Sequence, residues 1–287
     1  RDGKYLLMES GSHTTNEYSY LPADTSGGVF LVIAPRLDEQ EYYVDHRNGF
    51  FYIRTNDTGK NFRVVTVSVD GGGREAWTEL LPEDKQAPLE DFDVFDSFCV
   101  SSRRGLGLTT IEVIRFADGG KLGEAAKISF PEPVYTAQSH VNREFVTGSY
   151  RYSYQSLVSP ASVYDYTVAT GTSTLLKQQE VPGGFDSTRY ASERVWIDAE
   201  DGVRIPVSLV YRRDSFQRDG KNPLYIYGYG SYGYPLPIGF SSSRLSLLDR
   251  GVVMAYAHIR GGGEMGDPWH DAGKMMVKQN TFSDFIA

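Results

Sequence analysis

The segment Gly228–Gly233 combines glycines, a serine and tyrosines in a spacing that fits more than one chemistry. It reads G-Y-G-S-Y-G and so matches the G-x-G-x-x-G pattern of dinucleotide-binding turns. That pattern requires a helix to open at its third glycine, because the helix N-terminus must face the pyrophosphate. Pro235 and Pro237 follow immediately and disfavour such a helix. A nucleotide-dependent oxidoreductase that uses this loop therefore remains only an alternative.

Ser231 lies in the same segment, but its surroundings differ from those of a hydrolase nucleophile. The elbow that presents such a serine has the pattern G-x-S-x-G, with glycine two residues before and two residues after it. Tyr229 stands two residues before Ser231, and no other serine in the chain fits the pattern. The sequence therefore predicts no nucleophilic serine among these residues.

Histidine side chains can act as metal ligands or as general bases. The chain has five of them: His13, His46, His140, His258 and His270. They show neither metal-ligand spacing nor an H-E-x-x-H pair, so we expect no metal site. His258 ends an apolar run and His270 follows a tryptophan. Both are expected to be hydrogen-bonded structural residues.

Three consecutive glycines, Gly261–Gly263, stand between Arg260 and Glu264. Glycines allow either a tight turn or a close approach of the backbone to another group. A phosphate cradle is the functional alternative, but the run lacks the lysine of a P-loop. We expect a structural turn in which Arg260 and Glu264 are available for ion pairs. The pair Met275-Met276 is expected to fill a core on a helix.

An α/β unit would position these residues. The stretch 190–213 is typical of a β-hairpin around the turn Glu200-Asp201-Gly202. Two apolar runs follow at 223–230 and 251–259, and the second is continuous, as in a strand buried on both faces of a parallel sheet. The latter part of the remaining sequence is expected to be helical. This order of elements indicates an α/β domain, and we place its boundary near 183–186.

Aromatic residues recur at a nearly constant spacing upstream. Phe51, Phe98 and Phe145 are each 47 residues apart, and Tyr5 lies 46 residues before Phe51. Each stands in a short strand-like run, and the runs that follow recur in phase, at 17–24, 62–70, 109–118 and 162–170. A period of about 40 to 50 residues with four strands per unit is typical of a propeller blade. The sequence predicts roughly four blades, and a β-sandwich with accidental spacing is the alternative.

Composition restricts the classes of partner. The net charge of −8, without a dense stripe of Lys and Arg, argues against a nucleic-acid partner. No apolar stretch reaches the roughly 18 residues that a membrane-spanning helix needs. The single cysteine, Cys99, is expected in a strand core, and it favours a reducing, cytoplasmic compartment because it has no internal disulfide partner. The chain begins in a strand-like run and stops in a helical pattern, so both ends are expected to be cut.

The stretch 223–287 resembles the first part of the catalytic domain in the prolyl oligopeptidase family. Three blocks carry the resemblance: LYIYGYGSYGY, SRLSLLDRGVVMAYAHIRGGGEMGDPWH and GKMMVKQNTFSDF. Ser231, the run SRLSLLDRG and the ending NTFSDFIA are most similar to oligopeptidase B within that family. The family also has propeller repeats where this chain has its own.

The resemblance implies a serine peptidase in which a propeller caps an α/β-hydrolase domain and no cofactor is used. Members cleave short peptides with a Ser-Asp-His triad, and oligopeptidase B members cut after Lys or Arg. The family uses a tyrosine at the end of its YGYG strand to stabilise the oxyanion, and the matching residue here is Tyr229. A phenol can make that hydrogen bond. The triad has no match in this sequence, so we expect it outside the chain.

The fold class expected from these features is a partial β-propeller followed by the N-terminal part of an α/β-hydrolase domain. Residues 1–186 are predicted to form about four blades of an expected seven, and residues 187–287 the beginning of the hydrolase domain. Expected partners are short peptides with basic residues, and neither nucleic acid nor a membrane. The alternative function is a propeller-based binding module without catalytic activity.

Overall fold

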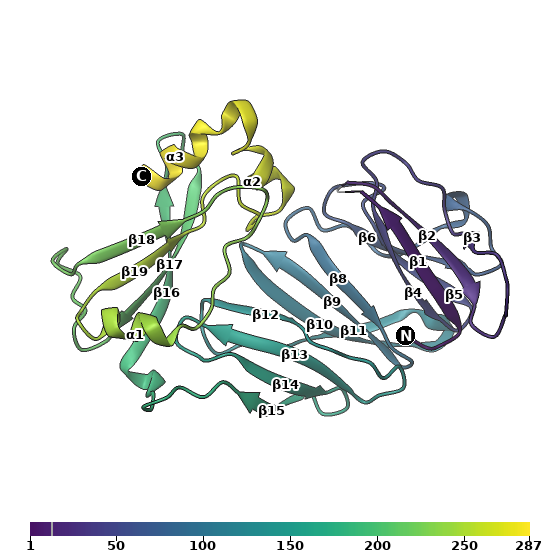
Figure 1. Ribbon diagram of the computed structural model, residues 1–287, viewed down its shortest axis with the longest axis horizontal. Helices are drawn as coiled ribbons and strands as arrows, with labels where there is room; N and C mark the ends of the chain where they lie inside the picture. Colours follow the sequence, from purple (N-terminus) through teal and green to yellow (C-terminus); the bar gives the residue numbers. More distant parts are fainter. Residues whose placement is uncertain (13) are drawn as a thin grey trace.

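Five small sheets follow one another along the chain in the computed structural model, which describes residues 1–12 and 14–287 (Figure 1). The first contains β1 (Tyr5–Gly11), β2 (Asn16–Pro22) and β3 (Leu31–Val32), and the second β4 (Tyr42–Arg47), β5 (Phe50–Thr55), β6 (Arg63–Ser68) and β7 (Thr78–Leu81). The third contains β8 (Leu89–Val94), β9 (Phe98–Gly105), β10 (Leu108–Phe116) and β11 (Leu122–Lys127), and the fourth β12 (Tyr135–Ser139), β13 (Ser149–Ser156), β14 (Ser162–Thr167) and β15 (Thr172–Gln178). Strands that are neighbours in sequence pair antiparallel in all four sheets. The predicted set of roughly four blades is confirmed, and the β-sandwich alternative is wrong.

Two-residue hairpins set the register inside two of these blades. Asn48 and Gly49 join β4 to β5 with φ angles of 50° and 77°. Leu106 and Gly107 join β9 to β10 with 50° and 77°. Two successive positive φ angles are typical of a type I′ turn, whose twist matches that of antiparallel strands. Leu106 and Gly107 thus close a hairpin within the third sheet.

Alternation of side chains builds the core between adjacent blades. Phe51 and Ile53 on β5 pack in a buried cluster with residues of the first sheet, whereas Tyr52 packs on the opposite face with residues of the third. The same alternation places Phe98 in the cluster shared with the fourth sheet. Successive side chains of a strand point to opposite faces, so the second and third blades each pack one face on the preceding sheet and the other on the following one. The blades are therefore held together mainly by apolar contacts.

Cys99 lies on the face of β9 opposite to Phe98 and is fully buried, so the prediction of a core cysteine is confirmed. Burial raises the pKa of its thiol to about 12. Only the thiolate reacts with alkylating reagents, so we expect iodoacetamide at mildly alkaline pH to leave the folded protein unmodified. The same reagent should alkylate Cys99 in concentrated urea, as mass spectrometry would report. Fast modification of the folded protein would contradict this placement.

Two sequence expectations are wrong in detail. Phe145 was expected in a strand, but it lies in the loop 140–148 before β13. This connection is longer than the corresponding Asn48-Gly49 turn, so the strand of the fourth blade starts later than the period predicts. Met275 and Met276 were expected in a core, but they are 84% and 97% exposed. They belong to a single 3₁₀ turn, and Met275 has a positive φ angle of 47°.

The fifth sheet has the strand order β16, β17, β19, β18 and contains β16 (Tyr190–Asp198), β17 (Arg204–Arg212), β18 (Leu224–Gly228) and β19 (Val253–Ala257). Its helices are α1 (Ser242–Leu248), α2 (Asp267–Asp271) and α3 (Gln279–Ile286). Short 3₁₀ turns are η1 (Arg74–Ala76), η2 (Asp118–Gly120), η3 (Ser187–Arg189) and η4 (Met275–Val277). The predicted hairpin is confirmed as β16 and β17, and β18 runs parallel to β19. β19 is largely buried, as its continuous apolar run predicted.

A buried cluster joins the fourth blade to the fifth sheet. Val134, Leu157 and Val158 from the blade pack with Val210 and Met254 from β17 and β19. The predicted domain boundary at 183–186 falls in the segment between β15 and β16 and remains a prediction. Among the helices of the described residues, none has the length and apolar character required to span a membrane.

Candidate active site

Tyr229 directly follows β18 at the carboxyl end of the fifth sheet. β18 and β19 are parallel, with Gly228 opposite Ala257, so the segments that follow the two strands meet at one sheet edge. In open α/β sheets this edge is the usual location of ligands. The Tyr229 side chain is 44% exposed, and its ring contacts that of Tyr234 edge-on, with 6.2 Å between centroids. Tyr229 thus stands at the end of a strand, and its side chain is not enclosed in a core.

The turn after Tyr229 contains three residues with left-handed backbone angles and fits closely against the segment that follows β19 and against α3. Gly230, Tyr232 and Gly233 have φ angles of 60°, 59° and 62°. A side chain at Gly230 would lie 2.6 Å from carbon atoms of Ile259 and Thr281. No helix opens at Gly233, since the next one is α1. The geometry therefore lacks the helix N-terminus that a dinucleotide fingerprint requires.

The glycine run after β19 forms a structural turn, as the sequence predicted. Gly261 has a φ angle of 95°, and a Cβ atom there would lie 2.2 Å from the carbonyl oxygen of Gly230. A Cβ atom at Gly263 would lie 2.1 Å from the carbonyl oxygen of Gly233. The Gly233 N–H donates to the Gly261 carbonyl at 3.1 Å. These glycines serve the close packing of two backbone segments rather than a phosphate.

Arg260 anchors α3 to the end of β19. Its guanidinium Nε lies 3.0 and 2.9 Å from the two carboxylate oxygens of Asp284, whose side chain is completely buried. The Arg260 backbone N–H also donates to Asp284, at 2.9 Å, and Nη1 donates to Asp201 at 2.6 Å. These two carboxylates raise the pKa of Arg260. The expected ion pairing of Arg260 is confirmed, and its partners come from α3 and from the β16–β17 turn.

Sequence reasoning missed the contacts of α3 with this edge. Lys278, Thr281 and Asp284 are spaced by three residues, and this spacing places side chains on one face of a helix. Thr281 Oγ1 donates to the carbonyl oxygens of Arg260 and Gly273, at 2.7 and 3.1 Å. Lys278 Nζ donates to the Gly230 carbonyl and, at 2.8 Å, to Ser231 Oγ. The i, i+3, i+6 spacing was the available signal.

A serine, a histidine and a glutamate form a buried hydrogen-bond chain that resembles a catalytic triad. His258 Nε2 lies 2.7 Å from Ser208 Oγ, and its Nδ1 lies 3.3 Å from Glu264 Oε1. The three residues are only 0%, 1% and 3% exposed, so no substrate reaches Ser208. Burial lowers the pKa of His258 and keeps the ring neutral. Glu264 Oε1 also accepts from the Leu236 N–H at 2.8 Å, so this chain of contacts is structural, as predicted for His258.

The other histidines do not form a site. His46 is buried and lies 2.6 Å from Asp2, whereas His140 is exposed. His13 lies outside the described residues. His270 was expected to be hydrogen-bonded, but within the described part of the chain its ring forms no hydrogen bond, and the nearest carboxylate oxygen, of Asp271, is 3.7 Å away. Over residues 1–12 and 14–287, no group of three His, Cys, Asp or Glu side chains is arranged to hold a metal ion.

A cavity of about 990 Å³ lies between the propeller loops and the turn that follows Tyr229. Glu39, Glu41 and Lys60 line it from the propeller, and Ser231, Tyr232 and Lys278 line it from the fifth sheet. Tyr229 itself is not part of this lining. Lys60 bridges the two sides through Asp271 at 2.8 Å, and Lys274 and Lys60 together lower the pKa of Asp271 to about 2.

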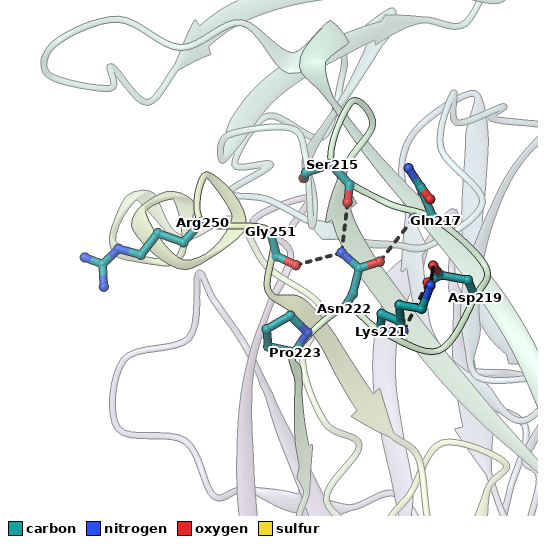
Figure 2. A pocket seen from close by; sticks show the side chains of 8 residues that line it. All are labelled: Ser215, Gln217, Asp219, Lys221, Asn222, Pro223, Arg250 and Gly251. Atoms are coloured by element: carbon teal, nitrogen blue, oxygen red, sulfur yellow. Dashed lines mark hydrogen bonds and ion pairs between the residues drawn. The ribbon is translucent and has the colours of Figure 1, made fainter.

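A smaller cavity of about 320 Å³ lies at the opposite, amino-terminal end of β18 (Figure 2). Asn222 fills its centre, with Nδ2 donating to the carbonyl oxygens of Ser215 and Gly251 at 2.8 and 3.0 Å. Its Oδ1 accepts from the Gln217 N–H at 3.1 Å, and Figure 2 shows the Arg250 side chain pointing away from this cluster. The side-chain amide of Asn222 is thus bonded to the backbone around the cavity, and its role is to hold the loop before β18 in place.

Comparison with known proteins gives the same picture. Residues 1–179 match the family described as prolyl oligopeptidase, N-terminal beta-propeller domain, and residues 238–287 match the prolyl oligopeptidase family. The chain is 43% identical to dipeptidyl aminopeptidase BI of Pseudoxanthomonas mexicana and 31% identical to protease 2 of Moraxella lacunata. Both alignments include 100% of this chain. It spans only 39% and 40% of the length of these relatives.

Solved structures agree with this placement. Oligopeptidase B from Leishmania major matches with a TM-score of 0.89 at 31% identity, covering 100% of this chain and 41% of that one. Oligopeptidase B from Trypanosoma brucei, in a closed form with covalently bound antipain, matches with a TM-score of 0.88 at 34% identity, covering 100% of this chain and 42% of that one. The predicted family and fold are thereby confirmed: this chain belongs to the prolyl oligopeptidase family of serine peptidases.

Proposed function

We propose that this chain forms the propeller part and the first catalytic segment of a serine oligopeptidase that hydrolyses short peptides through an acyl-enzyme. Family membership supports this function. The observation that carries it is the half-exposed Tyr229 at the carboxyl end of β18, beside the end of β19. Its hydroxyl is the proposed hydrogen-bond donor to the oxyanion. The Ser-Asp-His triad is contributed by residues outside 1–287, and no cofactor takes part.

The proposed substrates are short peptides cleaved after Lys or Arg. Similarity to two oligopeptidase B structures supports this preference. Glu39 and Glu41 also support it, because they bring carboxylates to the cavity beside the Tyr229 turn. The single cysteine, Cys99, supports a cytoplasmic location, since reducing compartments rarely retain disulfides. A pair of fluorogenic peptides that differ only in Arg or Pro before the scissile bond tests the preference, and equal kcat/KM values would contradict it.

Fluorophosphonate labelling of the full-length protein tests the acyl-enzyme chemistry. The probe is expected to modify one serine outside residues 1–287, located by tandem mass spectrometry. A Ser208→Ala variant should label equally well, because Ser208 is buried in the hydrogen-bond chain with His258 and Glu264. A full-length protein that takes up no label would instead favour the propeller-based binding module. An adduct on Ser208 would contradict its structural role.

A further inference from the structure

Lys278 connects α3 to the turn that follows Tyr229. Its Nζ atom contacts the Gly230 carbonyl oxygen and lies 2.8 Å from Ser231 Oγ. Both atoms are hydrogen-bond acceptors for an ammonium group, which has three donors. Gly230 is the residue next to Tyr229, and its φ angle of 60° is in the left-handed region. The lysine therefore bonds the first peptide carbonyl beyond the tyrosine.

The helix that begins after Lys278 is itself held in place by hydrogen bonds and an ion pair. Three residues further along, Thr281 Oγ1 donates to the Arg260 carbonyl at 2.7 Å. Three residues beyond that, Asp284 forms the buried ion pair with Arg260. Arg260 lies three residues after the end of β19, which pairs in parallel with β18. Lys278, at the N-cap of α3, thus contacts the turn after β18, while Thr281 and Asp284 of the same helix contact the segment after β19.

We propose that Lys278 is a positioning residue for Tyr229. Glycine peptides in tight turns adopt several backbone conformations, so the direction in which Tyr229 leaves β18 depends on what fixes the Gly230 carbonyl. A charge-assisted hydrogen bond to that carbonyl fixes it more strongly than a neutral one would. Hydrogen bonds to an oxyanion require donors in a narrow range of position. Lys278 acts on the reaction through the tyrosine hydroxyl, and this inference rests on the proposed function.

Replacing Lys278 by methionine in the full-length protein tests the proposal. Lys278→Met retains most of the apolar stem but removes the ammonium group, and we expect kcat to fall roughly 10-fold to 10²-fold, the range of a misplaced catalytic group. KM should change little, because the interaction with the oxyanion arises in the transition state. Lys278→Gln, which keeps an amide NH₂ group as an uncharged donor, should give an intermediate kcat and serves as the second variant should the methionine variant fold poorly. Lys221→Met is the matched control, since Lys221 is 83% exposed and lies at the other end of β18.

A double variant separates positioning from general stabilisation. In a Tyr229→Phe background, Lys278→Met should lower kcat by less than about twofold, because the hydroxyl it positions is absent. Full additivity of the two losses would overturn the proposal in favour of a structural role. A normal kcat for both Lys278 variants, with Tyr229→Phe impaired, would also overturn it and leave the proposed function standing. A normal kcat for Tyr229→Phe itself would remove the oxyanion role of Tyr229 and this inference together.

Discussion

Tyr229→Phe in the full-length protein is expected to lower kcat by roughly 10²-fold, the loss typical of one oxyanion donor. The substitution removes only the hydroxyl, and the ring can still contact Tyr234 edge-on. The tyrosine is 44% exposed, so little packing energy is at stake. KM should stay nearly unchanged, because the hydrogen bond strengthens as negative charge develops on the substrate oxygen. Steady-state kinetics with a fluorogenic peptide measures both constants.

Tyr225→Phe provides the matched control for this experiment. Tyr225 lies on β18, four residues before Tyr229, and is 51% exposed, so the control removes a hydroxyl from a tyrosine of similar exposure. Its kcat is expected to stay within about twofold of the unmodified protein. A Tyr229→Phe protein that folds normally and keeps full kcat would withdraw the oxyanion assignment.

Asp284→Asn is expected to destabilise the fold by about 3–5 kcal/mol, the usual cost of removing one partner from a buried ion pair. Asparagine has nearly the same size as aspartate, so the loss reports charge rather than packing. The Arg260 side chain is only 6% exposed and would retain a single carboxylate partner, Asp201. Urea unfolding followed by tryptophan fluorescence is suitable, since Trp196 lies on β16 and Trp269 on α2.

An exposed ion pair serves as the reference for Asp284→Asn. Asp198 lies 3.8 Å from Arg204, and their side chains are 79% and 65% exposed. Asp198→Asn should change the free energy of unfolding by less than about 1 kcal/mol, since solvent screens such pairs. Equal unfolding midpoints for the two variants would show that the Arg260–Asp284 pair does not hold α3.

The blades and the hairpin could be predicted from sequence because their signals are local. Alternation around Phe51 and Phe98 reports strands with two buried faces, and Asp201 and Gly202 mark the turn between β16 and β17. Phe145 misled because a constant period assumes constant loop lengths, and the loop 140–148 breaks that assumption. The strand-like runs that follow in each repeat all proved to be strands.

The candidate site was less accessible to sequence reasoning because its contacts join distant segments. Family resemblance pointed to Tyr229, but no local pattern connects it with Lys278, which is 47 residues beyond Ser231. The spacing of Lys278, Thr281 and Asp284 indicates a common helix face without indicating what that face meets. Met275 and Met276 show the opposite error, since their apolar character alone predicted burial. Whether a side chain in a turn points into the protein or into solvent depends on the backbone angles, and residue type alone does not give those angles.

The apolar cluster that unites Val134, Leu157 and Val158 with Val210 and Met254 bears on how this protein can be divided. The segment 179–189 between β15 and β16 links the fourth blade to the fifth sheet, and residues on both sides of this segment pack in the same cluster. If the chain were cut in that segment and the two pieces were separated, each piece would expose its part of this apolar cluster to water. The fourth blade and the fifth sheet should consequently melt as a single cooperative unit, so the covalent border and the energetic border of this molecule lie in different places.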